Sequence, residues 1–237
     1  MGQQNLNEYF TDLLQKVDLQ IQDFEDNNND PFSLCKQVID YLQEIIGELK
    51  AFIISYSFTS KEEEIYFFKE QKPIIASKII YYNTVYQFEL RFPNGSEERQ
   101  KEFIMAETDR ILAHFQRNIS FYQYYRTKAT YLDHKYFLRG KPDIHILIDN
   151  FYYEADPQFS TSYDYKVAKI LAIELFAIYL TNRLNELERR FQRQQVKNGN
   201  IKKLLRWTGT KRALVELIYA LYTNGDFNKG TVDIKDI

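Results

Sequence analysis

Apolar positions recur at helical spacing through most of this chain. In residues 5–25 they fall three, four or seven positions apart, which places them on one face of a helix. These are Phe10, Leu13, Leu14, Val17 and Ile21. A second helix is expected after Pro31, where Asp30 can cap and proline suits the first helical position. Another long amphipathic helix is expected from Glu97 to about Arg126.

Turn and break signals divide these helices. Ser60 followed by Glu63 fits a capping box, and Pro73 should kink or break the helix that follows. Residues 127–166 are less regular: "DIHILIDNFYYEAD" (143–156) fits a strand, an extended loop or short helical turns. Helix is expected again from Tyr163 to about Phe191, and "KNGN" (197–200) is typical of a hinge.

These elements predict an all-α fold. The chain has 237 residues but only eight glycines and five prolines, which argues against an all-β fold with its frequent turns. Long helices joined as antiparallel neighbours favour an up-and-down bundle. We expect a helical bundle over residues 1–195 and a small C-terminal domain over 196–237.

Charge is unevenly distributed. The formal net charge is −2, so bulk charge does not make the chain a binder of polyanions. Residues 1–30 hold seven acids and one base, whereas residues 189–212 hold nine bases and no acid. This asymmetry indicates a local basic surface, and the alternative interpretation is a solvated linker.

The sequence favours a cytoplasmic location. Its one cysteine, Cys35, allows no internal disulfide, and "MGQQNLNEYF" lacks the features of a secretion signal. The most apolar stretch (167–180) contains Lys169 and Glu174 and is too short to span a bilayer. We therefore expect a soluble protein with no membrane partner.

No enzymatic motif is evident. The three histidines, His114, His134 and His145, do not have metal-ligand spacing, and no glycine-rich phosphate loop is present. Asp133 and His134 are adjacent, so a helix would point them in different directions. We expect no catalytic residue, no metal site, no cofactor and no enzyme. A site assembled from distant residues, around 127–166, is the alternative left open.

Aromatic residues are abundant, with 19 tyrosines and 18 phenylalanines. "FYQYYR" and "FYYEAD" fit base-stacking platforms, but no positive track accompanies them, as such a groove requires. Packing within the bundle is the favoured interpretation.

The segment from Lys202 to Gly230 is the best candidate for binding chemistry. Leu214, Leu217, Ile218 and Leu221 share one helix face, and Thr208 or Thr210 can cap the start. Two bases then fall in the first turn, where the helix dipole favours acids, an arrangement that suits an incoming phosphate. With the preceding residues they form the candidate DNA-binding set: Lys202, Lys203, Arg206, Trp207, Lys211 and Arg212. Trp207 is expected to anchor the segment to the core, and stacking on a base is its less favoured role.

Three stretches carry a family resemblance: "YLDHKYFLRG", "FSTSYDYKVAKI" and "WTGTKRALVELIYAL". They resemble the RteC family of Bacteroides regulators, and the resemblance covers about the last half of the chain. It implies a helical N-terminal domain with a small C-terminal domain of winged-helix or helix-turn-helix type. The family's further helices past Ile237 leave two alternatives, a short family member or a recognition module that is incomplete here.

The resemblance also implies a function. RteC-type proteins are transcriptional regulators of conjugative transposons that bind double-stranded DNA upstream of excision genes and activate them in a tetracycline-induced cascade. We expect this function here, and we hypothesise a homodimer because such domains read paired half-sites. The alternative is a helical protein-interaction module without its own DNA binding.

Overall fold

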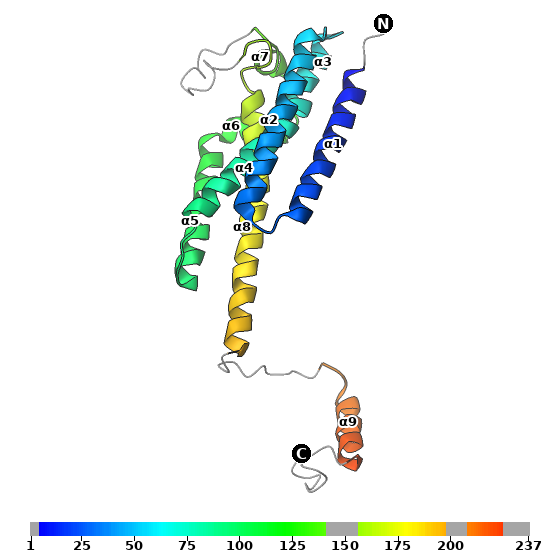
Figure 1. The fold of residues 1–237 in the computed structure, drawn as a ribbon, viewed down its shortest axis with the longest axis vertical. Coiled ribbons are helices and arrows are strands. Elements are labelled where there is room, and N and C mark those ends of the chain that lie inside the picture. Colours follow the sequence, from blue (N-terminus) through cyan, green and yellow to red (C-terminus); the bar gives the residue numbers. More distant parts are fainter. Residues whose placement is uncertain (1–4, 141–155, 198–207, 225–237) are drawn as a thin grey trace. The chain divides into compact units, whose positions relative to one another are not determined.

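The structure is a computed structural model that describes residues 5–140, 156–197 and 208–224. Every regular element within these ranges is a helix. The elements, drawn in Figure 1, are α1 (Leu6–Asn27), α2 (Pro31–Ser55), α3 (Lys61–Tyr66), the π-helix η1 (Phe67–Gln71), α4 (Lys72–Arg91), α5 (Glu97–Arg117), α6 (Ile119–Arg126), α7 (Asp133–Tyr136), α8 (Asp164–Lys197) and α9 (Lys211–Thr223). The predicted all-α class is confirmed for the described residues.

The chain divides into two compact units, Met1–Glu188 and Arg189–Ile237. The first unit is a bundle of long helices, in which α2 packs against both α1 and α4 (Figure 1). The second unit contains the end of α8 and the whole of α9. One helix with its cap does not establish a winged-helix domain, so that part of the fold stays a prediction. No helix among the described residues has both the length and the apolar content needed to cross a membrane.

The periodic positions form the core. Four of the five apolar residues predicted for the first helix, Phe10, Leu13, Val17 and Ile21, are buried in α1, and Leu14 is half-buried. The helix α2 has its own row of buried apolar residues, at the same helical spacing. It consists of Cys35, Val38, Leu42, Ile45, Leu49 and Ile53. Hydrophobic burial along facing helices therefore holds this bundle together, as in other antiparallel bundles.

Side-chain caps set the helix starts where the sequence predicted them. Asp30 accepts a hydrogen bond from the Ser33 amide at 2.8 Å, with Pro31 at the first position of α2. Ser60 accepts from the Glu63 amide at 3.1 Å, which is one half of the predicted capping box. The Glu63 carboxylate reaches back to the amide and hydroxyl of Thr59, at 2.6 and 2.7 Å.

Replacing Ser60 with alanine is expected to lower the free energy of unfolding by about 1 kcal/mol, because the Glu63 amide loses its acceptor. Urea denaturation followed by far-UV circular dichroism measures the change. Ser120→Ala, at an exposed position on α6, is the control and should cause no loss. Equal losses in the two variants would contradict a capping role for Ser60.

Pro73 does not break its helix, so of the kink or break predicted at this residue the break is wrong. The helix is continuous from Lys61 to Arg91, and η1 precedes the proline. The Lys72 amide donates to the carbonyl of Phe67, five residues back, which is the π-helical pattern. Pro73 then occupies the start of α4, where a missing N–H is tolerated.

One other predicted element differs from the structure. The single helix expected from Glu97 to Arg126 is two helices, α5 and α6, because Asn118 leaves the helical region at φ −113° and ψ 20°. Asn118 also donates from its side chain to the His114 carbonyl at 3.1 Å, so it replaces a backbone bond at the break. The segment 143–155, with its three alternative interpretations, lies outside the described residues.

Candidate nucleic-acid interface

The predicted DNA-binding helix is α9, and its start is capped as expected. Thr210 has extended backbone angles, φ −67° and ψ 153°, and its hydroxyl accepts from the Ala213 amide at 3.2 Å. Of the two threonines that the sequence allowed, Thr210 is therefore the cap. The helix then runs for 13 residues to Thr223, and Asn224 follows it.

Two predicted DNA-binding residues, Lys211 and Arg212, lie in the first turn of α9. Both side chains are exposed, and this turn carries no acidic residue. Arg212 pairs with Glu216 one turn later, with Nε to Oε1 at 3.0 Å and with both side chains mostly in solvent. An exposed pair of this kind contributes little to stability, so Arg212 can exchange Glu216 for another anion at small cost.

The other four predicted residues, Lys202, Lys203, Arg206 and Trp207, lie outside the described residues. The structure therefore brings together only Lys211 and Arg212 from the predicted set. Together with the amides of the first turn, these two side chains present positive charge at the N-terminal end of a helix, the arrangement that phosphate prefers.

Within the part of the chain that the structure describes, none of the side chains on the apolar face of α9 is buried. Leu214, Ile218 and Leu221 are half-buried, and Leu217 remains 44% exposed. A helix with this pattern gains most of its stability from packing its apolar face.

A buried ion pair in the first unit was missed by sequence reasoning. Lys69 is only 5% exposed, and its Nζ lies 2.8 Å from Oδ1 of Asp133 and 2.9 Å from the carbonyl of Ala129. The Tyr124 hydroxyl donates to the same carboxylate oxygen. Burial and this hydrogen bond raise the pKa of Tyr124, which keeps the hydroxyl protonated as a donor.

A second buried ion pair involves Lys72, which lies one helical turn after Lys69. Lys72 donates to Asp164, at the start of α8, and to the carbonyl of Phe159. Its Nζ also lies 4.3 Å from the centre of the Phe159 ring, a cation–π contact. The sequence signal for both pairs was present in "FFKEQK" (67–72), where two lysines stand within an apolar aromatic run. Buried lysines need partners, and those partners are far away in sequence.

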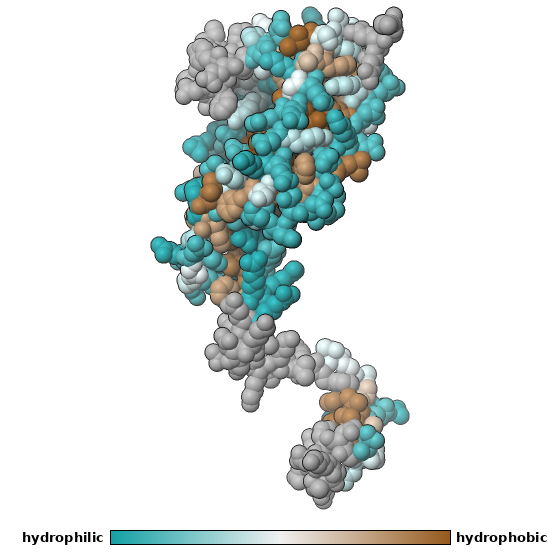
Figure 2. Space-filling view, viewed as in Figure 1, coloured by the Kyte–Doolittle hydropathy of each residue, from teal (hydrophilic) through white to brown (hydrophobic). Residues whose placement is uncertain are grey.

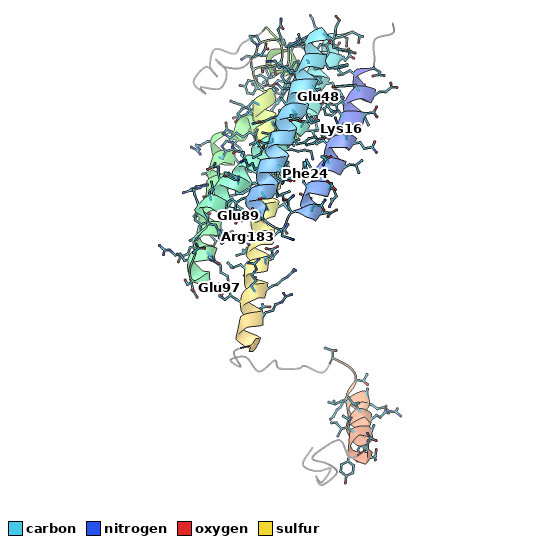
Figure 3. All side chains as sticks on the ribbon, viewed as in Figure 1. Lys16, Phe24, Glu48, Glu89, Glu97 and Arg183 are labelled. Atoms are coloured by element: carbon cyan, nitrogen blue, oxygen red, sulfur yellow. The ribbon has the colours of Figure 1, made fainter. Side chains whose placement is uncertain are left out.

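A third polar cluster joins α4 to α8. Figure 3 shows Glu89 and Arg183 side by side, and Arg183 Nε lies 3.1 Å from Oε1 of Glu89. The hydroxyl of Tyr179 donates to the same carboxylate at 2.5 Å. Burial, followed by this hydrogen bond, raises the pKa of Tyr179 above its ordinary value. These contacts fix the relative positions of two bundle helices and require no ligand to explain them.

The aromatic run "FYQYYR" packs inside the bundle, as the favoured interpretation predicted. Tyr124 is 4% exposed, and the ring of Phe121 lies 4.7 Å from that of Tyr163. Phe121, Tyr122 and Tyr125 are half-buried, and the rings of Phe121 and Tyr122 contact other rings of the same unit. Most of "FYYEAD" lies outside the described residues.

The predicted divergence of Asp133 and His134 is confirmed. Asp133 is buried against Lys69, whereas His134 is exposed. His145 lies outside the described residues. Within those residues, no group of three or more His, Cys, Asp or Glu side chains is arranged to hold a metal ion.

Comparison with models of known protein families identifies the family of this chain. The model of the family described as "RteC protein" matches residues 66–237, which is more than half of the chain. The chain therefore belongs to the RteC family, as the resemblance indicated, and this membership associates it with the regulation of conjugative transposons. No curated protein matches it significantly. No solved structure does so either.

The matched region begins at Tyr66, immediately before η1, and includes α9. It therefore contains both buried lysines, Lys69 and Lys72, with their aspartate partners. It also contains every residue of the candidate DNA-binding set.

Proposed function

We propose that this protein is a DNA-binding transcriptional regulator that activates the excision genes of a tetracycline-inducible conjugative transposon. The observation that carries the proposal is the family match over residues 66–237, which includes the basic segment and α9. The proposal places the protein in the cytoplasm, includes a homodimer, and assigns no enzymatic activity and no cofactor.

The geometry of α9 supports this proposal. Its first turn combines exposed Lys211 and Arg212 with amides that have no acceptor within the helix. Such a turn can hold a phosphate of the DNA backbone, while Lys202, Lys203 and Arg206 would add further phosphate contacts. Contacts of this kind give affinity and position the protein, and base contacts would be needed for sequence preference.

Binding to duplex DNA is expected to be specific and to weaken steeply with salt. The measurement is fluorescence anisotropy with a labelled duplex from upstream of a candidate excision operon, against a scrambled duplex, across a salt series. Each phosphate contact should contribute about −0.9 to the slope of log affinity against log salt. Lys211→Glu, Arg212→Glu, Lys203→Glu and Arg206→Glu should each lower affinity for both duplexes and make the slope shallower.

Lys36→Glu is the matched control, because Lys36 is an exposed base on α2 in the other unit. It should leave both affinity and salt slope unchanged. Equal weak binding to the two duplexes, or equal losses in Lys36→Glu and Lys211→Glu, would contradict the proposal.

A second candidate function is a protein-interaction module without its own DNA binding. The observation that favours it is the apolar face of α9: none of its described side chains is buried. Under this function, charge reversal at Lys202, Lys203 and Arg206 would leave activity intact, whereas Leu217→Glu would abolish it.

A further inference from the structure

The last turns of α8 (Asp164–Lys197) carry basic residues and no acid. The helix is unbroken, and its final segment, 189–197, holds three arginines, one lysine and no acidic residue. Arg189, Arg190 and Arg193 are all exposed. Figure 2 shows hydrophilic surface along the lower part of α8, which can be located from Figure 1. Three exposed positive charges therefore lie within little more than one turn of one helix.

Helix geometry places Arg189 and Arg193 on the same face of α8. Residues four apart are neighbours on a helix surface, and they are separated by about 6 Å along the helix axis. Like charges at this spacing repel each other and destabilise the helix. Arg193 has a base one turn away in both directions, because Arg189 precedes it and Lys197 follows it. An anion bound to these side chains would relieve the repulsion.

The nearest preceding acid on this side of α8 does not balance these charges. Glu186 lies 3.6 Å from Nη1 of Arg183. It also precedes Arg189 by three residues and Arg190 by four, so it is a neighbour of both on the helix surface. One carboxylate therefore serves three arginines, and Arg193 lies two turns away from it.

The other acids near this segment are also committed or distant. Glu188, the last acid on α8, lies 3.7 Å from Nζ of Lys101 on α5. The next acid along the chain is Glu216 on α9. The end of α8 therefore opens a run of nine bases without an acid, over residues 189–212.

The helix dipole accounts for only part of this arrangement. Bases are favoured in the last turn of a helix, where the carbonyls have no partner within the helix, and the effect falls off within that turn. The last turn of α8 is 194–197. Arg189 lies more than one turn before it, so the dipole does not explain a positive charge at that position.

Duplex DNA is the polyanion that fits this helix face. A duplex carries a phosphate about every 3.4 Å along each strand, so two arginines about 6 Å apart can both contact it. The guanidinium group is suited to phosphate because it offers paired donors. A helix that lies on an anionic membrane also needs an exposed apolar face. Phe191, the apolar residue between the two arginines, is half-buried.

We propose that Arg189 and Arg193 contact phosphates of the DNA duplex, so that the nucleic-acid interface begins on the last turns of α8. Both residues belong to the same compact unit as α9, Arg189–Ile237, and to the same run of bases as the candidate DNA-binding set. The inference rests on the proposed function, because it adds contacts to the binding site proposed there. These contacts add affinity without sequence preference, since phosphates carry no sequence information.

The first test is the salt dependence of duplex binding by the full chain, measured by fluorescence anisotropy. Arg189→Gln/Arg193→Gln should lower affinity roughly thirtyfold at about 0.15 M salt and make the log–log slope shallower by about 1.8, the loss of two phosphate contacts. The loss should be equal for the operon duplex and the scrambled duplex. Arg189→Lys/Arg193→Lys keeps both charges and should keep the slope.

The double variant Arg99→Gln/Arg117→Gln is the matched control. It removes the same charge from two exposed arginines on α5, in the other unit, and should leave affinity and slope unchanged. Far-UV circular dichroism should show the same helix content in both glutamine double variants and in the wild-type protein, because all four arginines are exposed.

The second test asks directly whether DNA lies beside the end of α8. Gln192 is exposed and lies between the two arginines in the sequence. Gln192→Cys carrying a photoactivatable cross-linker should attach to the labelled duplex, whereas Ser120→Cys on α6 should not. The native Cys35 is buried at 1% exposure, which raises the pKa of its thiol to about 11 and keeps it unreactive near pH 8.

The outcomes separate this inference from the proposed function. A wild-type protein that binds no duplex even at low salt would overturn both. Salt-dependent binding that Arg189→Gln/Arg193→Gln leaves unchanged, with no cross-link from position 192, would overturn the α8 contacts alone. An equal loss in the α5 control would overturn them too, because the effect would then come from overall charge. A selective loss with a shallower slope and a cross-link from position 192 would support them.

Discussion

Replacing Asp133 with alanine is expected to lower the free energy of unfolding by about 3–5 kcal/mol, the effect of removing one member of a buried ion pair. Lys69 would keep its charge at a site only 5% exposed, with one carbonyl and two aromatic faces nearby. The Tyr124 hydroxyl would also lose its acceptor. Urea denaturation followed by far-UV circular dichroism measures the loss.

Two further variants separate charge burial from simple loss of a contact. Asp156→Ala removes the partner of Lys50 from an ion pair of similar length, 2.9 Å, that is far more exposed, and the loss should be much smaller. The double variant Lys69→Met/Asp133→Leu removes both charges and should recover a large part of the stability. An Asp133→Ala protein no less stable than Asp156→Ala would contradict the importance of the buried pair.

Phe88→Ala is expected to cost about 3–5 kcal/mol of unfolding free energy through the cavity it leaves. Phe88 is fully buried on α4, and its ring centre lies 5.4 Å from Phe103, 5.7 Å from Phe176 and 5.9 Å from Tyr179. These neighbours belong to α5 and α8, so one side chain joins three helices. The midpoint of urea denaturation reports the loss, with the slope unchanged if the transition stays two-state.

Leu90→Ala is the matched control, because Leu90 lies on the same helix but is 54% exposed. Its effect should stay within about 0.5 kcal/mol. Phe88→Leu should fall between the two, since it refills part of the cavity. Similar losses at Phe88 and Leu90 would show that the aromatic cluster does not hold α4, α5 and α8 together.

The helices could be predicted from sequence because their determinants are local. The spacing of Phe10, Leu13, Val17 and Ile21 shows which face of α1 is buried, whatever it packs against. Asp30 and Ser60 likewise cap helices through bonds that reach only three residues along the chain. The break at Asn118 was missed because the apolar spacing continues across it, from Phe115 to Ile119 and Tyr122.

The buried pairs could not be predicted because their partners are distant in sequence. Lys69 and Asp133 are 64 residues apart, and Lys72 and Asp164 are 92 apart. Only the folded bundle brings them together, so the sequence signal was limited to two lysines among aromatic residues. Of the candidate DNA-binding set, Lys211 and Arg212 were placed correctly relative to the helix start, since a cap and a first turn are local features.

The two buried aspartates also affect how the chain crosses from α7 to α8. Asp133 and Asp164 lie on opposite sides of residues 141–155, and both are bound by lysines only three positions apart on one helix. The two ends of this connection are therefore held by the bundle itself.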